Sequence, residues 1–201
     1  KKTNYHYVLW FEEERTILIK HEEYDYKLPD IGNPKWIYLS SLAENSLTYH
    51  QQLSEYLRKN SEVKFAFQPG TFQMPKRQSH HGKGELFDNL KDLYHQSDVF
   101  FCNMEESRRI LDKPDEMDVK NLLREMHDFG PNVVVITDGA KGAYGYDGHE
   151  GFFMKPYPDP KPPYERTGAG DAFASTFTSA IALGKSLFDA FLWAPVNSMS
   201  V

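Results

Sequence analysis

Two runs rich in strand-forming residues open the chain. In the first, at 5–10, Tyr5, Tyr7 and Leu9 alternate with the residues between them, and the second, at 15–19, follows an acidic turn of glutamates. Period-two alternation is typical of β-strands. Residues 1–28 therefore predict a small antiparallel β-segment, with a third short strand at 24–28. Because an isolated hairpin is marginally stable in water, we expect it to pack on the rest of the chain or on a second copy.

Beyond a proline-punctuated connection at 29–34, short apolar runs alternate with longer amphipathic stretches. Strand, helix, strand at such lengths indicates βαβ units and a mostly parallel sheet, whose ligands bind at the carboxyl ends of the strands. The strands are expected at 36–40, 63–67, 98–102 and 132–137, the helices at 46–59, 85–95 and 117–129, and a hairpin at 143–155. The fold class is α/β, with 1–28 as a β lid and 29–201 as the core.

Composition excludes several classes of function. The net charge of −6 and the sequence pI near 5.8 lack the basic excess that a nucleic-acid or anionic-membrane surface needs. No apolar run approaches the ~18 residues that span a bilayer, and no signal peptide is recognisable behind the N-terminal lysines. Cys102, the single cysteine, lies in an apolar run and predicts a buried core residue. The cytoplasm is the expected compartment.

The stretch Thr167-Gly168-Ala169-Gly170-Asp171 carries the strongest chemical signal. Thr167 is a candidate N-cap, and the small and apolar residues after Gly170 predict a helix, so the glycines lie across the helix start. Free N–H groups there direct partial positive charge at a ligand, which predicts an anion site, most commonly for phosphate. A carboxylate beside a phosphate repels it. Asp171 therefore needs a role of its own, and proton abstraction from an attacking hydroxyl fits.

This stretch, followed by Ala-Phe-Ala, resembles the C-terminal signature of the ribokinase-like PfkB family of carbohydrate kinases. Two further motifs occur in the family's order: Asn103-Met104-Glu105-Glu106 is similar to its Asn-x-x-Glu motif, and residues 137–142 are similar to its Thr-x-Gly-x-x-Gly turn. The resemblance implies a ribokinase-like fold, in which a mostly parallel sheet lies between helices in a Rossmann-like three-layer arrangement. It also implies ATP and Mg²⁺ as cofactors and a small-molecule acceptor.

The resemblance implies a role for each matched residue. Asp171 is the catalytic base, and the amides of Gly168, Ala169 and Gly170 form an anion hole for the transferred phosphoryl group. Glu106 orders a metal-bound water, because Mg²⁺ in proteins keeps several waters. The residues implied along the nucleotide and its metal are Asn103, Glu106, Thr137, Gly139, Lys141, Gly142 and Asn197, and those implied at the acceptor are Arg15, Thr167 and Asp171.

Simpler explanations stay open for several residues. Asn103 by itself is a good helix N-cap, and the glycines of 137–142 also suit the turn of a hairpin. Arg15 is explained equally well as part of a lid strand that touches no substrate. The sequence at 68–71, after the second predicted strand, is interpreted as an ordinary turn, with a place beside the site as the alternative. The basic and histidine-rich stretch at 74–84 is interpreted as a surface loop rather than a phosphate or metal site.

The chain also departs from the family. Glu165-Arg166 stands where the family usually has Asp-Thr, which leaves open whether Arg166 touches a phosphate or faces solvent. The family's first strand and its Gly-Gly-Asn-type sugar-binding motif have no counterpart in these 201 residues. The sequence is therefore expected to be the later part of a longer kinase domain.

The sequence predicts an ATP-dependent kinase that phosphorylates a hydroxyl of a sugar or sugar-like alcohol, with nucleosides as another acceptor class on this fold. A dinucleotide oxidoreductase is disfavoured because Phe173 stands where a third glycine belongs, and a P-loop hydrolase because no Gly-Lys-Ser/Thr follows the glycines. The alternative from another class is a non-catalytic nucleotide-binding or assembly module. The exposed edge of the lid predicts a homodimer.

Overall fold

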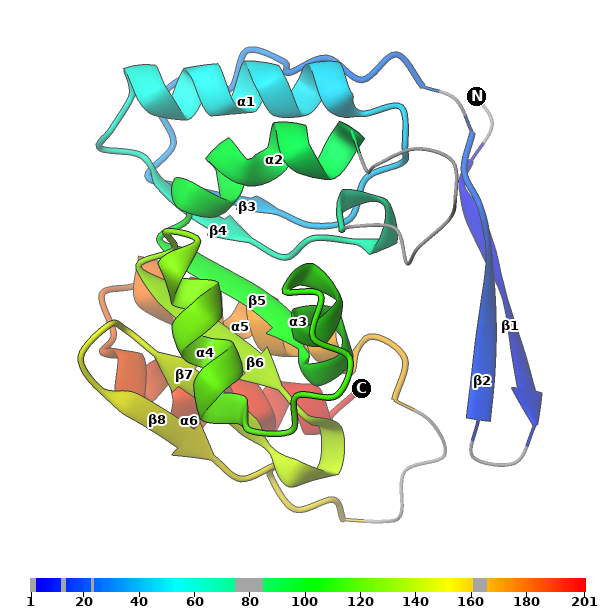
Figure 1. Cartoon of the computed structure of the whole chain (residues 1–201), viewed down its shortest axis with the longest axis vertical. Coiled ribbons are helices and arrows are strands. Elements are labelled where there is room, and N and C mark those ends of the chain that lie inside the picture. The colour runs from blue at the N-terminus through cyan, green and yellow to red at the C-terminus, as the bar shows by residue number, and fades with distance from the viewer. Residues whose placement is uncertain (1–2, 12–13, 23, 75–84, 161–165) are drawn as a thin grey trace.

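The backbone forms a two-stranded sheet beside a six-stranded sheet that has helices on both faces (Figure 1). This computed structural model describes residues 3–11, 14–22, 24–74, 85–160 and 166–201, with the side chains of residues 10–11, 14–15 and 85–89 left undescribed. The stretch at 75–84, interpreted above as a surface loop, lies outside the described residues.

The six strands of the larger sheet stand in the order in which they occur in the chain. The first four pair in parallel, and the last two continue the sheet as an antiparallel hairpin around Asp147-Gly148. The strands are β3 (Trp36–Leu39), β4 (Lys64–Phe67), β5 (Val99–Asn103), β6 (Val133–Thr137), β7 (Ala143–Tyr146) and β8 (Gly151–Met154). The predicted mostly parallel α/β sheet is confirmed.

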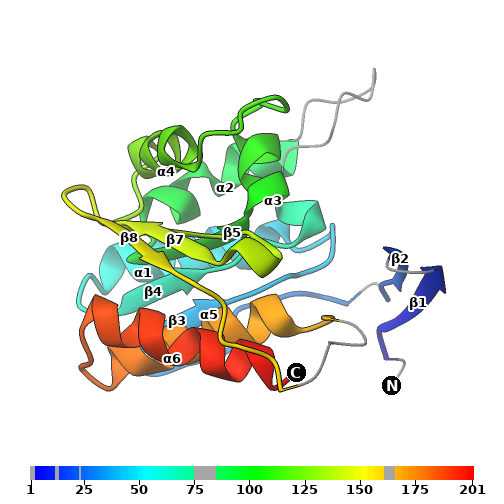
Figure 2. The same cartoon turned by 90° about the horizontal axis from the view of Figure 1, so that it is seen from below.

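Helices cover the sheet as two layers. Crossovers between neighbouring parallel strands share one hand, so helices that connect strands added in one direction gather on one face. Figure 2 shows α1–α4 on that face and α5 and α6 on the other. The bounds are α1 (Leu47–Lys59), α2 (Glu85–His95), α3 (Met104–Ile110), α4 (Val119–Asp128), α5 (Ala169–Ala182) and α6 (Leu187–Met199), with short 3₁₀ turns η1 (Thr71–Gln73) and η2 (Gly139–Lys141).

The central strand β5 contributes to two hydrophobic cores. Phe100 and Cys102 pack with the helices α1, α2 and α4, whereas Val99 and Phe101 pack with α5 and α6. All four side chains are buried, as is expected for a parallel strand covered on both faces. Cys102 is therefore a core residue, as predicted.

Aromatic packing fixes α5, the helix that starts at the glycine-rich stretch. Phe177 is fully buried and meets Phe101 of β5 edge to face, with ring centroids 5.4 Å apart, and Phe191 of α6 at 5.0 Å. Burying one such side chain stabilises the fold by about 1.5–3 kcal/mol. Because this anchor lies in the middle of α5, the first turn of the helix is held at the carboxyl edge of the sheet.

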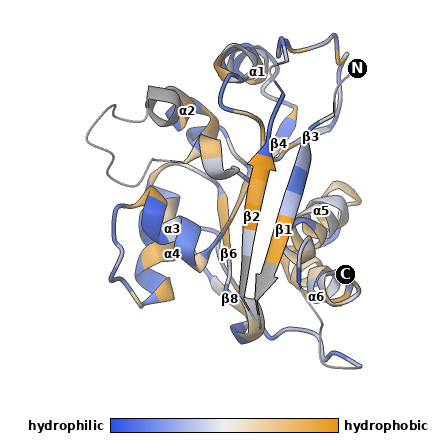
Figure 3. Cartoon of the chain, turned by 90° about the vertical axis from the view of Figure 1, so that its right-hand side faces the viewer, coloured by the Kyte–Doolittle hydropathy of each residue, from blue (hydrophilic) through white to orange (hydrophobic). Residues whose placement is uncertain are grey.

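The hairpin of β1 (Tyr5–Phe11) and β2 (Glu14–Lys20) stands beside this core. Its apolar side chains are solvent-exposed on both faces: Tyr7 and Leu18 are opposite one another on one face, and Val8 and Ile17 on the other. Figure 3, which looks at the hairpin from outside, shows apolar residues along both strands.

The third lid strand predicted at 24–28 is wrong. Backbone groups of this segment are bound by side chains of the core instead of a strand partner. Asn45 Nδ2 donates to the Tyr24 carbonyl at 2.8 Å, and the Leu28 N–H donates to Gln52 Oε1 at 2.8 Å. The segment is thus an extended connection tied to α1 and to the turn that precedes it.

Candidate active site

The glycine-rich stretch forms a tight turn into α5. Gly168 has a φ of 90°, a left-handed conformation that favours glycine, and it is the N-cap residue in place of the predicted Thr167. The Ala172 N–H donates to the Gly168 carbonyl at 2.8 Å, which starts the helical pattern one residue after Thr167. Thr167 was the wrong N-cap because the left-handed turn needs a residue without a Cβ at the boundary.

The three amides predicted for the anion hole differ in their surroundings. The Ala169 N–H donates within the turn to the Arg166 carbonyl at 3.2 Å. Gly170 lies in the first helical turn, where N–H groups have no helical carbonyl to bind, and a Cβ built on it would meet no atom within 4 Å. The space beside Gly170 is therefore open to a ligand that approaches the helix start.

Asp171 is exposed and follows this open turn directly. Its Oδ1 accepts a hydrogen bond of 2.9 Å from Nε2 of Gln68, the residue after β4. Gln68 Oε1 in turn accepts from the hydroxyl of Tyr38 in β3. Burial, and after it the negative charge of Asp171, raises the pKa of Tyr38, which therefore stays a protonated hydrogen-bond donor at neutral pH.

Asn103 and Glu106 form a reciprocal capping box at the start of α3. Asn103 Oδ1 accepts from the Glu106 N–H at 2.8 Å, and Glu106 Oε2 accepts from the Asn103 N–H at 2.9 Å. Asn103 is therefore an N-cap, as the simpler explanation predicted. Burial raises the pKa of Glu106, and the negative charges of Glu105 and Asp171 act in the same direction. The hydrogen bond from the Asn103 N–H and the charge of Arg109 oppose this rise in the pKa of Glu106.

The two glycines of the turn after β6, Gly139 and Gly142, differ in their surroundings. A Cβ on Gly142 would lie 2.3 Å from the Met154 carbonyl oxygen of β8, so this glycine is required by close packing in the sheet. A Cβ on Gly139 would meet nothing within 4 Å. Thr137 ends β6, and Lys141 is exposed with its Nζ 3.3 Å from Asp138 Oδ2. The open side of this turn lies over Gly139.

Three further residues considered in the sequence analysis have partners other than Asp171 and the glycine turn. Arg15 pairs through its backbone with Trp10 in the hairpin, and its side chain lies outside the described part of the chain. Asn197 of α6 donates to Thr176 Oγ1 of α5 at 2.8 Å. Arg166 forms an ion pair with Asp159, which answers the question left open by the sequence: its guanidinium faces a carboxylate.

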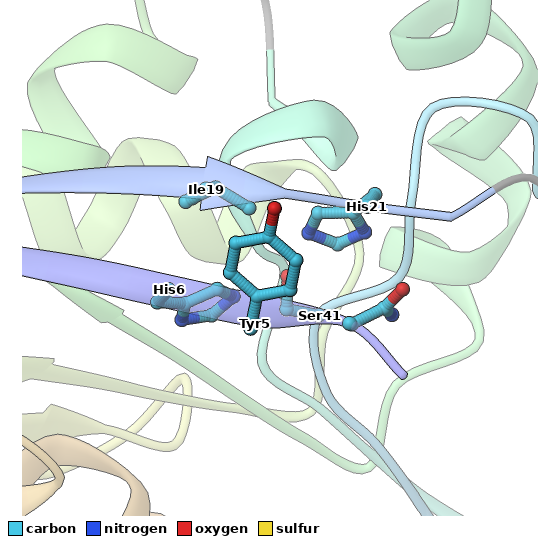
Figure 4. Close-up of a pocket in the computed structure, with 6 residues that line it drawn as sticks. Tyr5, His6, Ile19, His21 and Ser41 are labelled. Carbon is cyan, nitrogen blue, oxygen red and sulfur yellow. The ribbon is translucent and has the colours of Figure 1, made fainter. Parts of the chain in front are cut away.

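A cavity of about 420 Å³ lies between the base of the hairpin and the core (Figure 4). Tyr5, His6, Ile19 and His21 line it from the hairpin side, and Ser41 from the loop after β3. The rings of His6 and His21 are stacked with centroids 6.1 Å apart. Ser41 also lies against Gly70, close to the turn that carries Gln68.

The described residues contain no cluster of three or more His, Cys, Asp or Glu side chains arranged to hold a metal ion. Among the helices that the structure describes, none is both long and apolar enough to cross a bilayer.

This arrangement defines an α/β protein whose candidate site residues lie at the carboxyl ends of β3–β6 and at the start of α5, with a β-hairpin beside the sheet. Residues 1–196 match the family described as pfkB family carbohydrate kinase, and the chain belongs to this family. The predicted family is confirmed.

Known proteins similar to the chain agree with this assignment. A stretch of 100 residues is 34% identical to the cytidine kinase of Thermococcus kodakarensis and covers 50% of this chain and 35% of that protein. Another of 129 residues is 28% identical to the ATP-dependent 6-phosphofructokinase of Thermoanaerobacterium thermosaccharolyticum, covering 64% and 37%. Arabidopsis thaliana ribokinase, solved with ribose and ATP, has a TM-score of 0.72 at 18% identity, covering 92% of this chain and 58% of that one.

The solved structure shares the ribokinase-like fold. The chain spans little more than a third of the length of the curated relatives it matches.

Proposed function

We propose that the protein transfers the γ-phosphoryl group of ATP to a hydroxyl of a sugar or sugar-like alcohol. The observation that carries this proposal is the position of Asp171, an exposed carboxylate in the first turn of α5 beside an open glycine turn. A helix start favours a phosphate, and a carboxylate there opposes it unless the carboxylate takes part in the reaction. Membership of the pfkB family supports the same reaction class.

In the proposed reaction, the acceptor oxygen attacks the γ-phosphorus and its proton passes to the Asp171 carboxylate. The bond between the γ-phosphorus and the bridging oxygen of the β-phosphate breaks, and ADP leaves. The N–H groups of Gly168 and Gly170, with the positive end of α5, stabilise the charge of the phosphoryl group. The Ala169 N–H supports the turn through Arg166. Positioning and electrostatics supply most of the acceleration in phosphoryl transfer, so a rigid turn suits it.

The residues present fit Mg²⁺. Glu106 uses Oε2 for the cap, which leaves its other carboxylate oxygen for a metal-bound water, and the charge of Asp171 adds to the attraction for a cation. Few protein ligands and several waters are what Mg²⁺ prefers. When bound, the ion neutralises charge on the phosphates.

The nucleotide is proposed to lie over the turn of Thr137, Gly139 and Gly142, where the side of Gly139 is open. The ammonium group of exposed Lys141 would leave its ion pair with Asp138 and bind a phosphate instead. Asn197 of α6 would lie beside the adenine. Asn103, which caps α3 beside Glu106 at the end of β5, would lie on the metal side of the nucleotide.

The acceptor is proposed to enter between the hairpin and the core, with Arg15 and Thr167 beside it. The cavity of about 420 Å³ at the base of the hairpin is large enough for a small molecule, which typically needs roughly 300 Å³ or more, and it lies at the other end of the hairpin from Arg15. Similarity over half of the chain to a cytidine kinase favours nucleosides as the second acceptor class. The apolar faces of the hairpin support a homodimer through this lid.

The test is ADP release from Mg-ATP over hexoses, pentoses, keto-sugar acids and nucleosides, using the longest natural form of the protein that contains this chain. Asp171→Asn is expected to lower kcat by roughly 10³-fold or more, in the range of general-base catalysis, with ATP affinity changed less than about twofold. Acceptor-dependent turnover lost in the variant supports the proposal. Turnover retained by the variant would contradict Asp171 as the base.

Nucleotide binding without turnover on any acceptor would favour the alternative, a non-catalytic nucleotide-binding module.

A further inference from the structure

Three side chains from separate elements form a single line of hydrogen bonds that ends on Asp171. Tyr38 comes from β3, Gln68 from the end of β4 and Asp171 from the first turn of α5. Tyr38 and Gln68 are half-buried, whereas Asp171 is exposed. The line therefore runs from the sheet outward to the candidate base.

The chemistry of the groups fixes the direction of each hydrogen bond. A carboxylate only accepts, so the Gln68 atom that faces Asp171 must be the NH₂ nitrogen. The Gln68 carbonyl oxygen then faces Tyr38, whose hydroxyl must donate. A flipped amide would set a carbonyl oxygen against the carboxylate. Gln68 thus has one favoured orientation, and Tyr38 is the group that secures it.

We propose that Gln68 is a positioning residue that holds Oδ1 of Asp171 and leaves Oδ2 to take the proton of the acceptor hydroxyl, with Tyr38 locking the Gln68 amide. This inference rests on the proposed role of Asp171 as the base. An exposed aspartate samples several staggered side-chain rotamers, and a charge-assisted hydrogen bond to one oxygen selects among them.

A neutral amide suits this position better than a cation. Gln68 donates a hydrogen bond to Asp171, and the charge of Asp171 acts on the hydroxyl of Tyr38 and on the carboxyl of Glu106. A lysine at position 68 would hold the carboxylate as an ion pair and oppose its role as a base. Gln68 fixes geometry and adds no charge beside the phosphates.

The test compares kcat and KM in Gln68→Ala, Gln68→Glu and Tyr38→Phe, with Gln51→Glu on the exposed face of α1 as the matched control. Gln68→Ala is expected to lower kcat about 10- to 100-fold with KM for ATP changed less than about twofold, because small misplacements of a reacting group have effects of this size. Gln68→Glu, which fills the same space but cannot donate, is expected to be at least as impaired.

Tyr38→Phe is expected to lower kcat about threefold to tenfold in the wild-type background and to have no further effect when Gln68 is already Ala, as coupled residues do. Gln51→Glu is expected to match the wild type. Wild-type kcat in Gln68→Glu would overturn the proposal, because a space-filling role would then suffice. Additive effects of Tyr38→Phe and Gln68→Ala would overturn the part assigned to Tyr38.

A readout independent of activity separates this inference from the proposed function. In ¹H–¹⁵N spectra, one Nε2 proton of Gln68 is expected to show a hydrogen-bonded shift that is lost in Asp171→Ala and altered in Tyr38→Phe. If this signal is present but no acceptor is phosphorylated, the proposed function fails while the hydrogen-bond line stands. If Asp171-dependent turnover occurs without the signal, the positioning role fails while the function stands.

Discussion

Gln68 and Gln73 lie on the same short segment after β4, yet their surroundings are opposite. Gln68 is half-buried and binds the exposed carboxylate of Asp171. Gln73 is fully buried: its Oε1 accepts from the N–H groups of Gly70 at 2.8 Å and Leu42 at 3.2 Å, and its Nε2 lies 2.7 Å from Nε2 of His50. One glutamine ends at the site and the other ends inside the protein.

The difference shows that the contribution of a polar side chain to stability or to the reaction depends on its burial and on its hydrogen-bond partner. The residue type alone does not decide it. In the interior, each group that loses its partner keeps the full penalty of desolvation, so Gln73 acts on stability. Beside the exposed Asp171, water replaces a lost partner at little cost, so Gln68 is expected to act on geometry and rate instead of stability. The Gln73 amide also fixes the tautomer of His50, whose Nδ1–H then donates to the Ser46 carbonyl at 2.7 Å.

The largest expected effect comes from Gln73→Ala. It removes the acceptor of two backbone N–H groups and the donor to His50, and we expect a loss of about 4 kcal/mol in the free energy of unfolding. Urea unfolding measures this. Gln68→Ala, as the matched control, is expected to change the same free energy by less than about 0.5 kcal/mol. Equal destabilisation by Gln73→Ala and Gln68→Ala would contradict the conclusion that only the buried glutamine acts on stability.

Gly70→Ala is expected to lower both stability and kcat, because Gly70 lies between Gln68 and Gln73 in the chain. A Cβ there would lie 1.9 Å from Oγ and 2.9 Å from Cα of Ser41, so one of the two loops must move. We expect a loss of about 3 kcal/mol in the free energy of unfolding, at the upper end of overpacking effects.

If the loop after β4 is the one that moves, it carries Gln68 away from Asp171. We therefore expect kcat to fall together with stability in Gly70→Ala. Urea unfolding and steady-state kinetics on one preparation test both. A variant with lowered stability and wild-type kcat would show that the two glutamines are mechanically independent.

The smallest expected effect is the loss of stability between about pH 7 and about pH 5.5. Burial lowers the pKa of His50 to about 4, against an ordinary 6.5, with the bond to the Ser46 carbonyl opposing it. The unfolded chain therefore takes up this proton at higher pH than the folded one, and stability falls as pH drops below about 6.5 and levels off below about 4. From about pH 7 to about pH 5.5 the expected loss is about 1 kcal/mol.

Unfolding at several pH values measures this dependence, with His50→Gln as the comparison. Because the variant lacks the titrating ring, its stability is expected to fall less steeply over that range. Identical slopes in the two proteins would show that His50 does not titrate between the folded and unfolded states.

The elements of the fold were largely predictable because each depends on a local pattern. The helix at Glu85–His95 has the predicted bounds, and the strand predicted at 132–137 is observed at Val133–Thr137, because helical periodicity and a short apolar run can each be recognised within a few residues. The strand predicted at 24–28 failed because side chains distant in sequence, such as Asn45, bind its backbone. Thr167 failed as N-cap because a left-handed turn depends on φ, which composition does not report.

The line from Tyr38 to Asp171 could not be predicted from sequence. Gln68 was interpreted as part of an ordinary turn, and the one available signal was its place at the carboxyl end of a strand. Tyr38 gave no signal, because it looked like any half-buried residue of a strand. The contacts join residues that lie far apart in the chain, and no single sequence pattern encodes such a meeting. The roles assigned to Asp171, Glu106 and Lys141 stay predictions.

The strands of the larger sheet lie side by side in the order in which they are synthesised, and this has a consequence for the nascent chain. As β3 to β6 emerge in turn, α1–α4 shield one face of the growing sheet, but the opposite face, including Phe101 and Val135, waits for α5 and α6. A ribosome-bound chain that has not yet reached residue 169 presents this bare apolar surface, which invites aggregation or a chaperone. The helix whose first turn carries Asp171 thus also helps, together with α6, to cover the apolar face of this sheet.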